Sequence, residues 1–231
     1  MTIIKGKTTT IMARYAISDI HGCYHTFKEL LNTIGLNKSD ELILLGDYIN
    51  RGNYSKEVVD FIMQLESEKY NIHCLKGNHE EMIFDSIIYD DNPNSEDVTL
   101  KSFGITNWKE IPKKYINWFL KLKPYHISSN YILVHAGLDF SKESYLQEYR
   151  NMYWIRDWYK DIDYNRLGNK KIIHGHQSIT KNDIIKMRDE LEDSQVLGID
   201  NGCYKTDQYG LGKLCCFNLD TKELYFEVNK D

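Results

Sequence analysis

A chain of 231 residues, with 42% hydrophobic and 27% charged residues, has the composition of a soluble globular protein and the length of one large domain. The formal net charge of -5, without a lysine/arginine cluster, argues against a nucleic-acid binder. No apolar run reaches the length of a membrane span, no signal peptide is visible, and five cysteines without a CxxC pair argue against a disulfide framework. We therefore expect a cytoplasmic protein that needs no membrane, nucleic acid or obligate partner.

The first half of the chain alternates expected strands and helices, which favours a parallel sheet. Residues 1–12 begin with a polar stretch, so we interpret them as an N-terminal extension that ends where Met12 leads into the first strand. Gly35 is the expected end of the first helix, and Ser55 is the expected N-cap of the second. Short apolar runs predict strands at 14–17, 42–45 and 71–75, and apolar residues at helical spacing predict a helix after each of them.

The second half is expected to add another sheet with helices outside it. Residues 89–107 are expected to form an irregular surface insertion near the site, where substrate specificity is often determined. Because no linker or repeat interrupts the chain, we expect a single domain over residues 1–231. The other expected elements are a helix opened by Pro112, strands leading to His135 and His174, helices at 144–159 and 182–191, and strands at 196–199, 213–218 and 223–228.

Five of the expected strands end in side chains that can bind a metal ion. In an open α/β sheet the carboxyl ends of the strands form the edge at which ligands bind. Oxygen and nitrogen donors without cysteine favour manganese, iron or zinc, and two such ions can clamp a phosphoryl group between them. The sequence therefore predicts a dinuclear metal site. Its candidate ligands are Asp19, His21, Asp47, Asn78, His135, His174 and His176.

The motifs that carry these residues also support a family resemblance. The order D-x-H-G, G-D-x-x-x-R-G, G-N-H-E, H-A-G, H-G-H resembles the calcineurin-like metallophosphoesterases, specifically their phosphoprotein phosphatase branch, over residues 14–217. The resemblance implies a four-layer α/β/β/α sandwich and two divalent transition-metal ions, with manganese favoured over iron or zinc. It implies a first metal held by Asp19, His21 and His176, a second held by Asn78, His135 and His174, and Asp47 as the bridge.

The same resemblance assigns catalytic roles to residues beside the ligands. His79 matches the general acid that protonates the leaving group as a metal-activated hydroxide attacks, a role that suits an imidazole near neutral pH. Arg51 and Arg156 match the phosphate-binding arginines, whose planar forks fit two phosphoryl oxygens. Asn78 and His79 complete the set expected to contact the substrate phosphate.

One position departs from the family pattern. Asn50 stands where the protein phosphatases have an aspartate that orients the catalytic histidine. An asparagine can hydrogen-bond His79, but it cannot stabilise an imidazolium by charge, so we expect slower turnover. The related symmetrical diadenosine tetraphosphate hydrolases also lack this aspartate. Against them, Asn53 follows Gly52 where they usually have proline, and the third motif reads GNHE instead of GNHD.

These observations favour a phosphatase that acts on phosphoserine and phosphothreonine in proteins, and also on phosphotyrosine. The alternative is a symmetrical diadenosine tetraphosphate hydrolase. A third hypothesis, a non-catalytic binding module that has kept the fold, is disfavoured because the expected ligands, His79 and both arginines are all present. The expected partner is thus a phosphoprotein or phosphopeptide substrate.

Overall fold

The computed structural model describes residues 12–89 and 97–231 of the chain. The expected N-terminal extension, apart from Met12, and residues 90–96 of the expected insertion lie outside the described residues. In the described part, no helix has both the length and the apolar character needed to cross a membrane.

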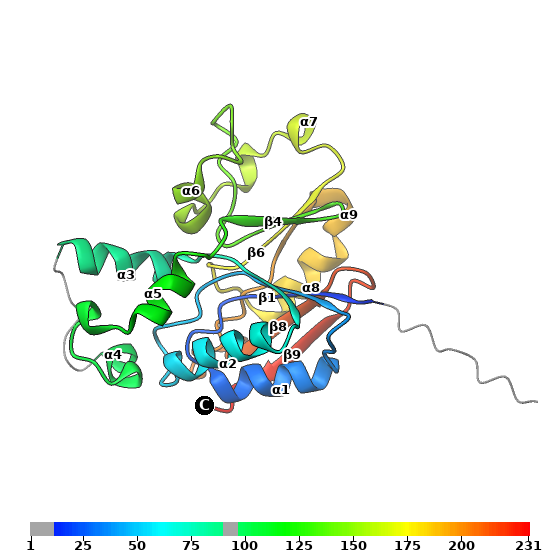
Figure 1. Ribbon diagram of the computed structural model, residues 1–231. Coiled ribbons are helices and arrows are strands. Elements are labelled where there is room, and N and C mark those ends of the chain that lie inside the picture. The colour runs from blue at the N-terminus through cyan, green and yellow to red at the C-terminus, as the bar shows by residue number, and fades with distance from the viewer. Residues whose placement is uncertain (1–11, 90–96) are drawn as a thin grey trace, which may run out of the picture.

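Two mixed sheets form the centre of the fold (Figure 1). In the first sheet, β1, β2 and β3 run parallel, β8 pairs antiparallel with β1, and β9 pairs antiparallel with β8. In the second, β5, β6 and β7 run parallel and β4 is antiparallel. The order of the first sheet is β3 (Asn71–Cys74), β2 (Glu41–Leu44), β1 (Arg14–Ile17), β8 (Lys213–Asn218) and β9 (Leu224–Val228). The order of the second is β4 (Tyr125–Ser128), β5 (Tyr131–Val134), β6 (Lys171–His174) and β7 (Val196–Gly198).

Alternation along the strands separates two hydrophobic layers, because successive side chains of a strand point to opposite faces. Leu42 and Leu44 of β2 pack with Phe27 of α1 (Tyr24–Ile34) and with α2 (Ser55–Ser67), outside the first sheet. Ile43 of β2 points the other way and packs with Leu133 of β5 between the sheets. A third cluster, which includes residues of α6 (Tyr149–Trp154), covers the outer face of the second sheet. The expected four-layer α/β/β/α sandwich is confirmed.

The remaining helices flank this sandwich. Figure 1 shows α3, α4 and α5 grouped beside one end of the sheets. The bounds are α3 (Asn78–Tyr89), α4 (Val98–Phe103), α5 (Lys113–Phe119), α7 (Tyr164–Leu167), α8 (Lys181–Asp189) and α9 (Leu191–Ser194), with 3-10 turns at Trp108–Glu110 and Tyr159–Asp161.

Four local expectations were wrong. The insertion is not irregular up to residue 107, because Asp97 caps α4 by accepting from the backbone N–H groups of Thr99 and Leu100. The helix expected over 144–159 is confined to α6. Strand β4 was not expected, since its sequence YHIS is polar. Ser55 is the first residue of α2 and not its N-cap, because its hydroxyl accepts from the Asn50 N–H instead.

Candidate metal centre

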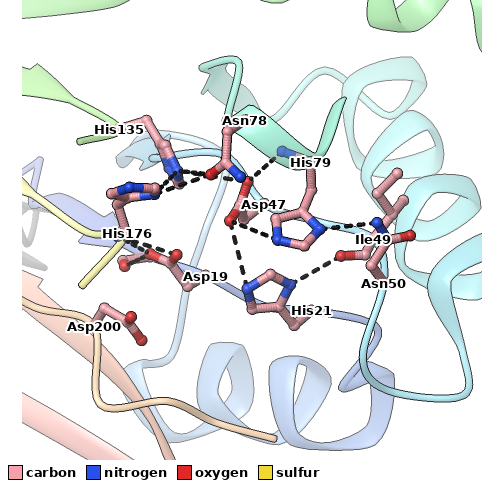
Figure 2. Close-up of polar contacts among 12 residues, drawn as sticks. Asp19, His21, Asp47, Ile49, Asn50, Asn78, His79, His135, His176 and Asp200 are labelled. Carbon is pink, nitrogen blue, oxygen red and sulfur yellow. Dashed lines mark hydrogen bonds and ion pairs between the residues drawn. The ribbon is translucent and has the colours of Figure 1, made fainter. Parts of the chain in front are cut away.

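The carboxyl ends of strands from both sheets meet at one site. Figure 2 shows Asp19, which follows β1, and Asp47, which follows β2, facing His135 after β5 and His176 after β6. Asn78 joins them from the first turn of α3. The edge predicted from the strand pattern is therefore the edge at which these side chains converge.

Tight turns at the strand ends aim these side chains inward. Several non-glycine residues of the site have left-handed backbone conformations: Asp19, His21, Asp47, Asn50, Arg51 and His176. Such conformations cost free energy for residues other than glycine and concentrate at functional sites. Hydrogen bonds between the turns hold them in place, including those from the His21 N–H to the Asp47 carbonyl and from the Gly52 N–H to the His21 carbonyl, both 2.9 Å.

Asp47 lies at the centre of the cluster. Its Oδ2 is 3.4 Å from His21 Nε2, and its Oδ1 is 3.5 Å from His135 Nε2. Backbone carbonyls fix the orientation of both rings, because Nδ1 of His21 donates to the Ile49 carbonyl and Nδ1 of His135 donates to the Leu45 carbonyl, each at 2.9 Å. Each ring therefore presents the lone pair of Nε2 to Asp47, which is the arrangement of a histidine ligand with an outer hydrogen bond.

His176, His135 and Asn78 form a tight group on one side of Asp47. Asn78 Oδ1 lies 3.0 Å from His135 Nε2 and 2.9 Å from His176 Nδ1, and the two ring nitrogens are 3.2 Å apart. This differs from the expected grouping, in which His176 shared a metal with Asp19 and His21. The turn at Gly175 directs the His176 ring toward Asn78, while only its backbone N–H contacts the Asp19 carboxylate, at 3.0 Å.

His174 stands apart from this group. Its Nδ1 donates to the Gly175 carbonyl at 2.9 Å, and its Nε2 accepts a 2.6 Å hydrogen bond from the Tyr159 hydroxyl. Both ring nitrogens are thus occupied by protein partners. The structure therefore does not bring His174 together with Asn78 and His135, as the expected second metal site required.

Burial disfavours the charged forms of the candidate ligands. Burial, followed by the neighbouring Glu80 and Asp19, raises the pKa of Asp47 well above its usual range. Burial, followed by the neighbouring Asp200, also raises the pKa of Asp19 well above its usual range. Burial also lowers the pKa of His135 well below its usual range, with His176 contributing. Desolvation thus opposes charge on both kinds of side chain in the absence of a cation.

His79 faces the same space from the start of α3. Its Nε2 is 3.9 Å from Asp47 Oδ2, and burial followed by the charge of Arg51 lowers its pKa to about 4. Asn50 Nδ2 lies 2.8 Å from His79 Nδ1, and the Thr99 hydroxyl donates to Asn50 Oδ1 at 2.7 Å. The structure thus brings together the two residues of the expected acid-orienting pair, and adds Thr99 from α4 behind them.

Three cationic side chains line the mouth of the site. Arg51, Arg156 and Lys205 border a cavity of about 370 Å³ whose floor includes Asp47 and His79. The Arg51 guanidinium and the Lys205 ammonium each lie 5.6 Å from the centre of the Tyr204 ring. That ring packs edge-on against His21 at 5.0 Å, so one aromatic side chain holds two cations beside a candidate ligand.

Several of these residues were missed by sequence reasoning. Glu80 is fully buried, and its carboxylate accepts from the backbone N–H groups of Asp47, Tyr48 and Gly77 at 2.8–2.9 Å. Its place in the GNHE motif was the only available signal. Asp200, two residues after β7, repeats the pattern of a strand end with a carboxylate, so the rule that identified Asp19 and Asp47 also identifies it.

The donor set fits divalent cations. His135 Nε2 and Asn78 Oδ1 lie 3.0 Å apart with lone pairs turned toward Asp47, an arrangement that a cation between them would stabilise. His176 Nε2 is buried without a hydrogen-bond partner. A Cβ atom on Gly175 would lie 2.0 Å from Asp19 Oδ2, and one on Gly77 would lie 2.1 Å from Asp47 Oδ1, so both carboxylates need a glycine beside them.

Comparisons with known proteins agree with this geometry. The sequence profile of the calcineurin-like phosphoesterase family matches residues 12–213. Two solved structures share the fold across nearly the whole chain. A putative diadenosine tetraphosphatase aligns with a TM-score of 0.64 at 18% identity, covering 94% of both chains. A protein serine/threonine phosphatase from Saccharomyces cerevisiae aligns with a TM-score of 0.66 at 16% identity, covering 96% of this chain and 80% of that one.

Two relatives that are similar in sequence have the same name. The symmetrical bis(5'-nucleosyl)-tetraphosphatase of Nitrosospira multiformis is 31% identical over 55% of this chain and 44% of its own length. The corresponding protein of Haemophilus ducreyi is 32% identical over 55% of this chain and 46% of its own length. This chain thus spans about half the length of the curated relatives it matches.

These relatives overturn the expected substrate. The prediction that favoured a phosphoprotein phosphatase is wrong, because relatives at 30–34% identity are named symmetrical tetraphosphatases. This chain has the GNHE motif and Asn53 and is nevertheless 30–34% identical to these relatives, so neither feature excludes the tetraphosphatase alternative. Asn50, at a position where the tetraphosphate hydrolases also lack the aspartate of the protein phosphatases, was the more informative departure.

Proposed function

The chain belongs to the calcineurin-like phosphoesterase family, and from this premise we propose that it is a metal-dependent hydrolase of dinucleoside tetraphosphates. The proposed cut is symmetrical and yields two nucleoside diphosphates. The observation that carries the proposal is the 30–34% identity to symmetrical bis(5'-nucleosyl)-tetraphosphatases.

The charge around the cavity supports a polyphosphate. Arg51, Arg156 and Lys205 place three cations at the mouth of one cavity of about 370 Å³. A phosphate monoester offers a single phosphoryl group to such a cavity, whereas a tetraphosphate chain offers several oxygens beyond the bond that is cut. Cations compensate the negative charge of a polyphosphate most effectively when they are held in position. Tyr204 holds Arg51 and Lys205 in this way.

The family implies divalent metal ions, and the residues present fit them. We propose that Asp47 is shared between two ions, with His21 and Asp19 on one side and Asn78, His135 and His176 on the other. We do not assign His174 as a ligand, because the Tyr159 hydroxyl and the Gly175 carbonyl occupy its two nitrogens. When bound, such ions would polarise the phosphoryl group and supply an acidic water, with manganese the favoured metal and iron or zinc the alternatives.

The chain's own residues would bind the substrate and stabilise the leaving group. In this proposal Arg51 and Arg156 bind oxygens of the phosphoryl group that is attacked, and Lys205 binds the phosphate beyond it. The Nε2–H of a neutral His79 donates a hydrogen bond to the leaving phosphate oxygen, since Asn50 engages Nδ1 of the same ring. The leaving group is a nucleoside diphosphate, whose phosphate oxygen needs less help from an acid than an alkoxide does.

The test compares two substrates with metal-stripped protein resupplied with Mn²⁺. Initial rates on diadenosine tetraphosphate and on a phosphothreonine peptide would be measured, and the nucleotide products separated by chromatography. We expect ADP as the sole nucleotide product, little phosphate release from the peptide, and a large loss of rate in His79→Asn. Formation of ATP and AMP would refute the symmetrical cut, and faster release from the peptide would refute the substrate class.

A further inference from the structure

A second group of metal-ligating side chains lies at the opposite end of strand β2 from the proposed catalytic centre. Glu41 is the first residue of β2, whereas Asp47 follows its last residue. Around Glu41 lie His73 of β3 and His126 of β4. Candidate ligand atoms of these three side chains all lie within 4.8 Å of one another. We call them the Glu41 cluster.

The fold brings these residues together from the edges of two different sheets. Glu41 lies on the same face of β2 as Ile43, which packs between the sheets, and His73 is the register partner of Ile43. His126 pairs directly with Leu133, which also packs between the sheets. Because β3 and β4 are the edge strands of their sheets, the cluster closes one side of the layer between the sheets.

The distances within the cluster match those between ligands of one tetrahedral ion. Glu41 Oε1 lies 3.2 Å from His73 Nε2 and 3.1 Å from His126 Nε2. Two ligands at 2.0–2.2 Å from a tetrahedral zinc ion are about 3.3–3.6 Å apart, slightly farther than these pairs. The two imidazole rings stack with their centres 4.0 Å apart and an angle of 18° between their planes, so their Nε2 atoms lie side by side at one carboxylate oxygen, and a rotation of one ring would bring both lone pairs onto one ion.

The outer hydrogen bonds of the cluster engage the other carboxylate oxygen and leave Oε1 to the two imidazoles. The Ser128 hydroxyl donates to the other oxygen, Glu41 Oε2, at 2.7 Å, and Arg14 donates to the Ser128 oxygen at 3.2 Å. The charge of Arg14 is compensated by Asp220, which it contacts at 2.6 Å. A carboxylate ligand oriented by a hydroxyl in this way is typical of built metal sites. Lys123, which acts electrostatically on His73, is the cation that opposes metal binding here.

The side chains are sheltered but reachable. The exposed fractions are 14% for Glu41, 16% for His126 and 22% for His73. Because these three side chains are partly exposed, an ion can enter the site. Three protein ligands also keep a fourth coordination position open for water.

We propose that the Glu41 cluster is a separate binding site for a divalent cation of the zinc class, independent of the catalytic centre. Two imidazole nitrogens and one carboxylate oxygen provide the ligands. Because one histidine comes from each sheet, a bound ion would link the two sheets at the side away from the reaction. Its stabilising effect would therefore appear in unfolding and not in turnover.

The experiment measures zinc stoichiometry on the full chain. Metal-stripped protein would be titrated with Zn²⁺ against a chromophoric chelator, comparing wild type with Glu41→Gln and His126→Gln. We expect each variant to bind one equivalent fewer than wild type. The matched control is His25→Gln, because His25 is exposed on α1 and lies outside both the Glu41 cluster and the candidate metal centre. It should bind as wild type does.

The expected difference of one zinc equivalent between wild type and variant does not depend on the proposed function. The catalytic centre is the same in both proteins, so the ions that it holds cancel in the comparison. Equal stoichiometry in wild type and both variants would overturn the site, and the cluster would then be a pair of histidine–glutamate hydrogen bonds. Ring proton signals of the wild-type histidines provide a readout that needs no variant. Zn²⁺ must shift the signals of His73 and His126, and unshifted signals at saturating zinc would also overturn the proposal.

Discussion

Asn50 donates from Nδ2 to Nδ1 of His79 at 2.8 Å, and its orientation is fixed from behind by Thr99, whose hydroxyl donates to Asn50 Oδ1 at 2.7 Å. Because the carbonyl end of the amide is engaged by Thr99, only the NH₂ end can face the imidazole. The proton of a neutral His79 is therefore on Nε2, which points toward Asp47 and the cavity. Asn50 thus orients the His79 imidazole without adding charge.

Asn50→Asp should raise kcat, because a carboxylate would stabilise the imidazolium form of His79. A charged hydrogen bond is worth about 1–2 kcal/mol more than a neutral one, which corresponds to a rise on the order of tenfold. The measurement is kcat on an activated aryl phosphate and on diadenosine tetraphosphate. Thr99→Val is the control and should lower kcat, since it frees the amide to rotate. An unchanged or lower kcat in Asn50→Asp would contradict the role assigned to this residue.

Glu80→Gln should destabilise the whole site without touching a candidate ligand side chain. The glutamate accepts from three backbone N–H groups in the turns that carry Asp47 and Gly77. Glutamine would turn an NH₂ group toward at least one of those donors, at a cost of about 2–4 kcal/mol. In a chain of this size the melting temperature should fall by about 6–12 °C.

Glu81→Gln provides the matched control for Glu80. Glu81 is the next residue of α3 and makes an ion pair with Lys76 at 3.0 Å near the surface. Pairs of this kind contribute less than about 1 kcal/mol. Calorimetry of both variants should thus show a large shift for one glutamate and a small shift for its neighbour. Equal shifts would mean that Glu80 does not hold the turns.

Lys205→Met should separate polyphosphate binding from the chemical step. The Lys205 ammonium lines the cavity and lies 5.6 Å from the centre of the Tyr204 ring. Losing one charge-assisted contact should raise KM for diadenosine tetraphosphate by about tenfold. KM for an aryl phosphate, which has no further phosphate, should change little. A similar change for both substrates would show that Lys205 contacts the phosphoryl group that reacts.

Removing bound metal should lower the melting temperature as well as abolish activity. Without cations, burial raises the pKa of Asp19 and Asp47 and disfavours the ionised carboxylates that a bound cation would stabilise. A ligand present at a hundred times its dissociation constant stabilises the folded state by about 2.7 kcal/mol. Calorimetry with and without Mn²⁺ after chelation measures the effect. An identical melting temperature would argue against metal binding by these carboxylates.

The sequence predicted those parts of the fold in which the pattern of apolar residues is enough to determine the secondary structure. β1 and β8 were predicted to the residue because buried strands are continuous apolar runs. β4 was missed because its two inward-facing residues, His126 and Ser128, are polar and bind Glu41 instead of packing in a core.

Part of the candidate site could be predicted from the sequence, and its arrangement could not. The strand-end rule found the residues that converge on Asp47, because the carboxyl ends of parallel strands share an edge. It could not separate His174 from His176, since both lie at the same strand end and only the turn at Gly175 decides which ring enters the site. Tyr204 and Lys205 come from a loop whose path is set by tertiary contacts, so no periodic pattern marks them.

The separation of the candidate ligands along the chain has a consequence for folding kinetics. Asp19 and His176 are 157 positions apart and come from different sheets, so the complete site cannot form until both sheets have docked. Contacts of such long range are made late, and interactions absent from the folding transition state act mainly on the unfolding rate. Bound metal should thus leave the refolding rate nearly unchanged and prolong the lifetime of the native state.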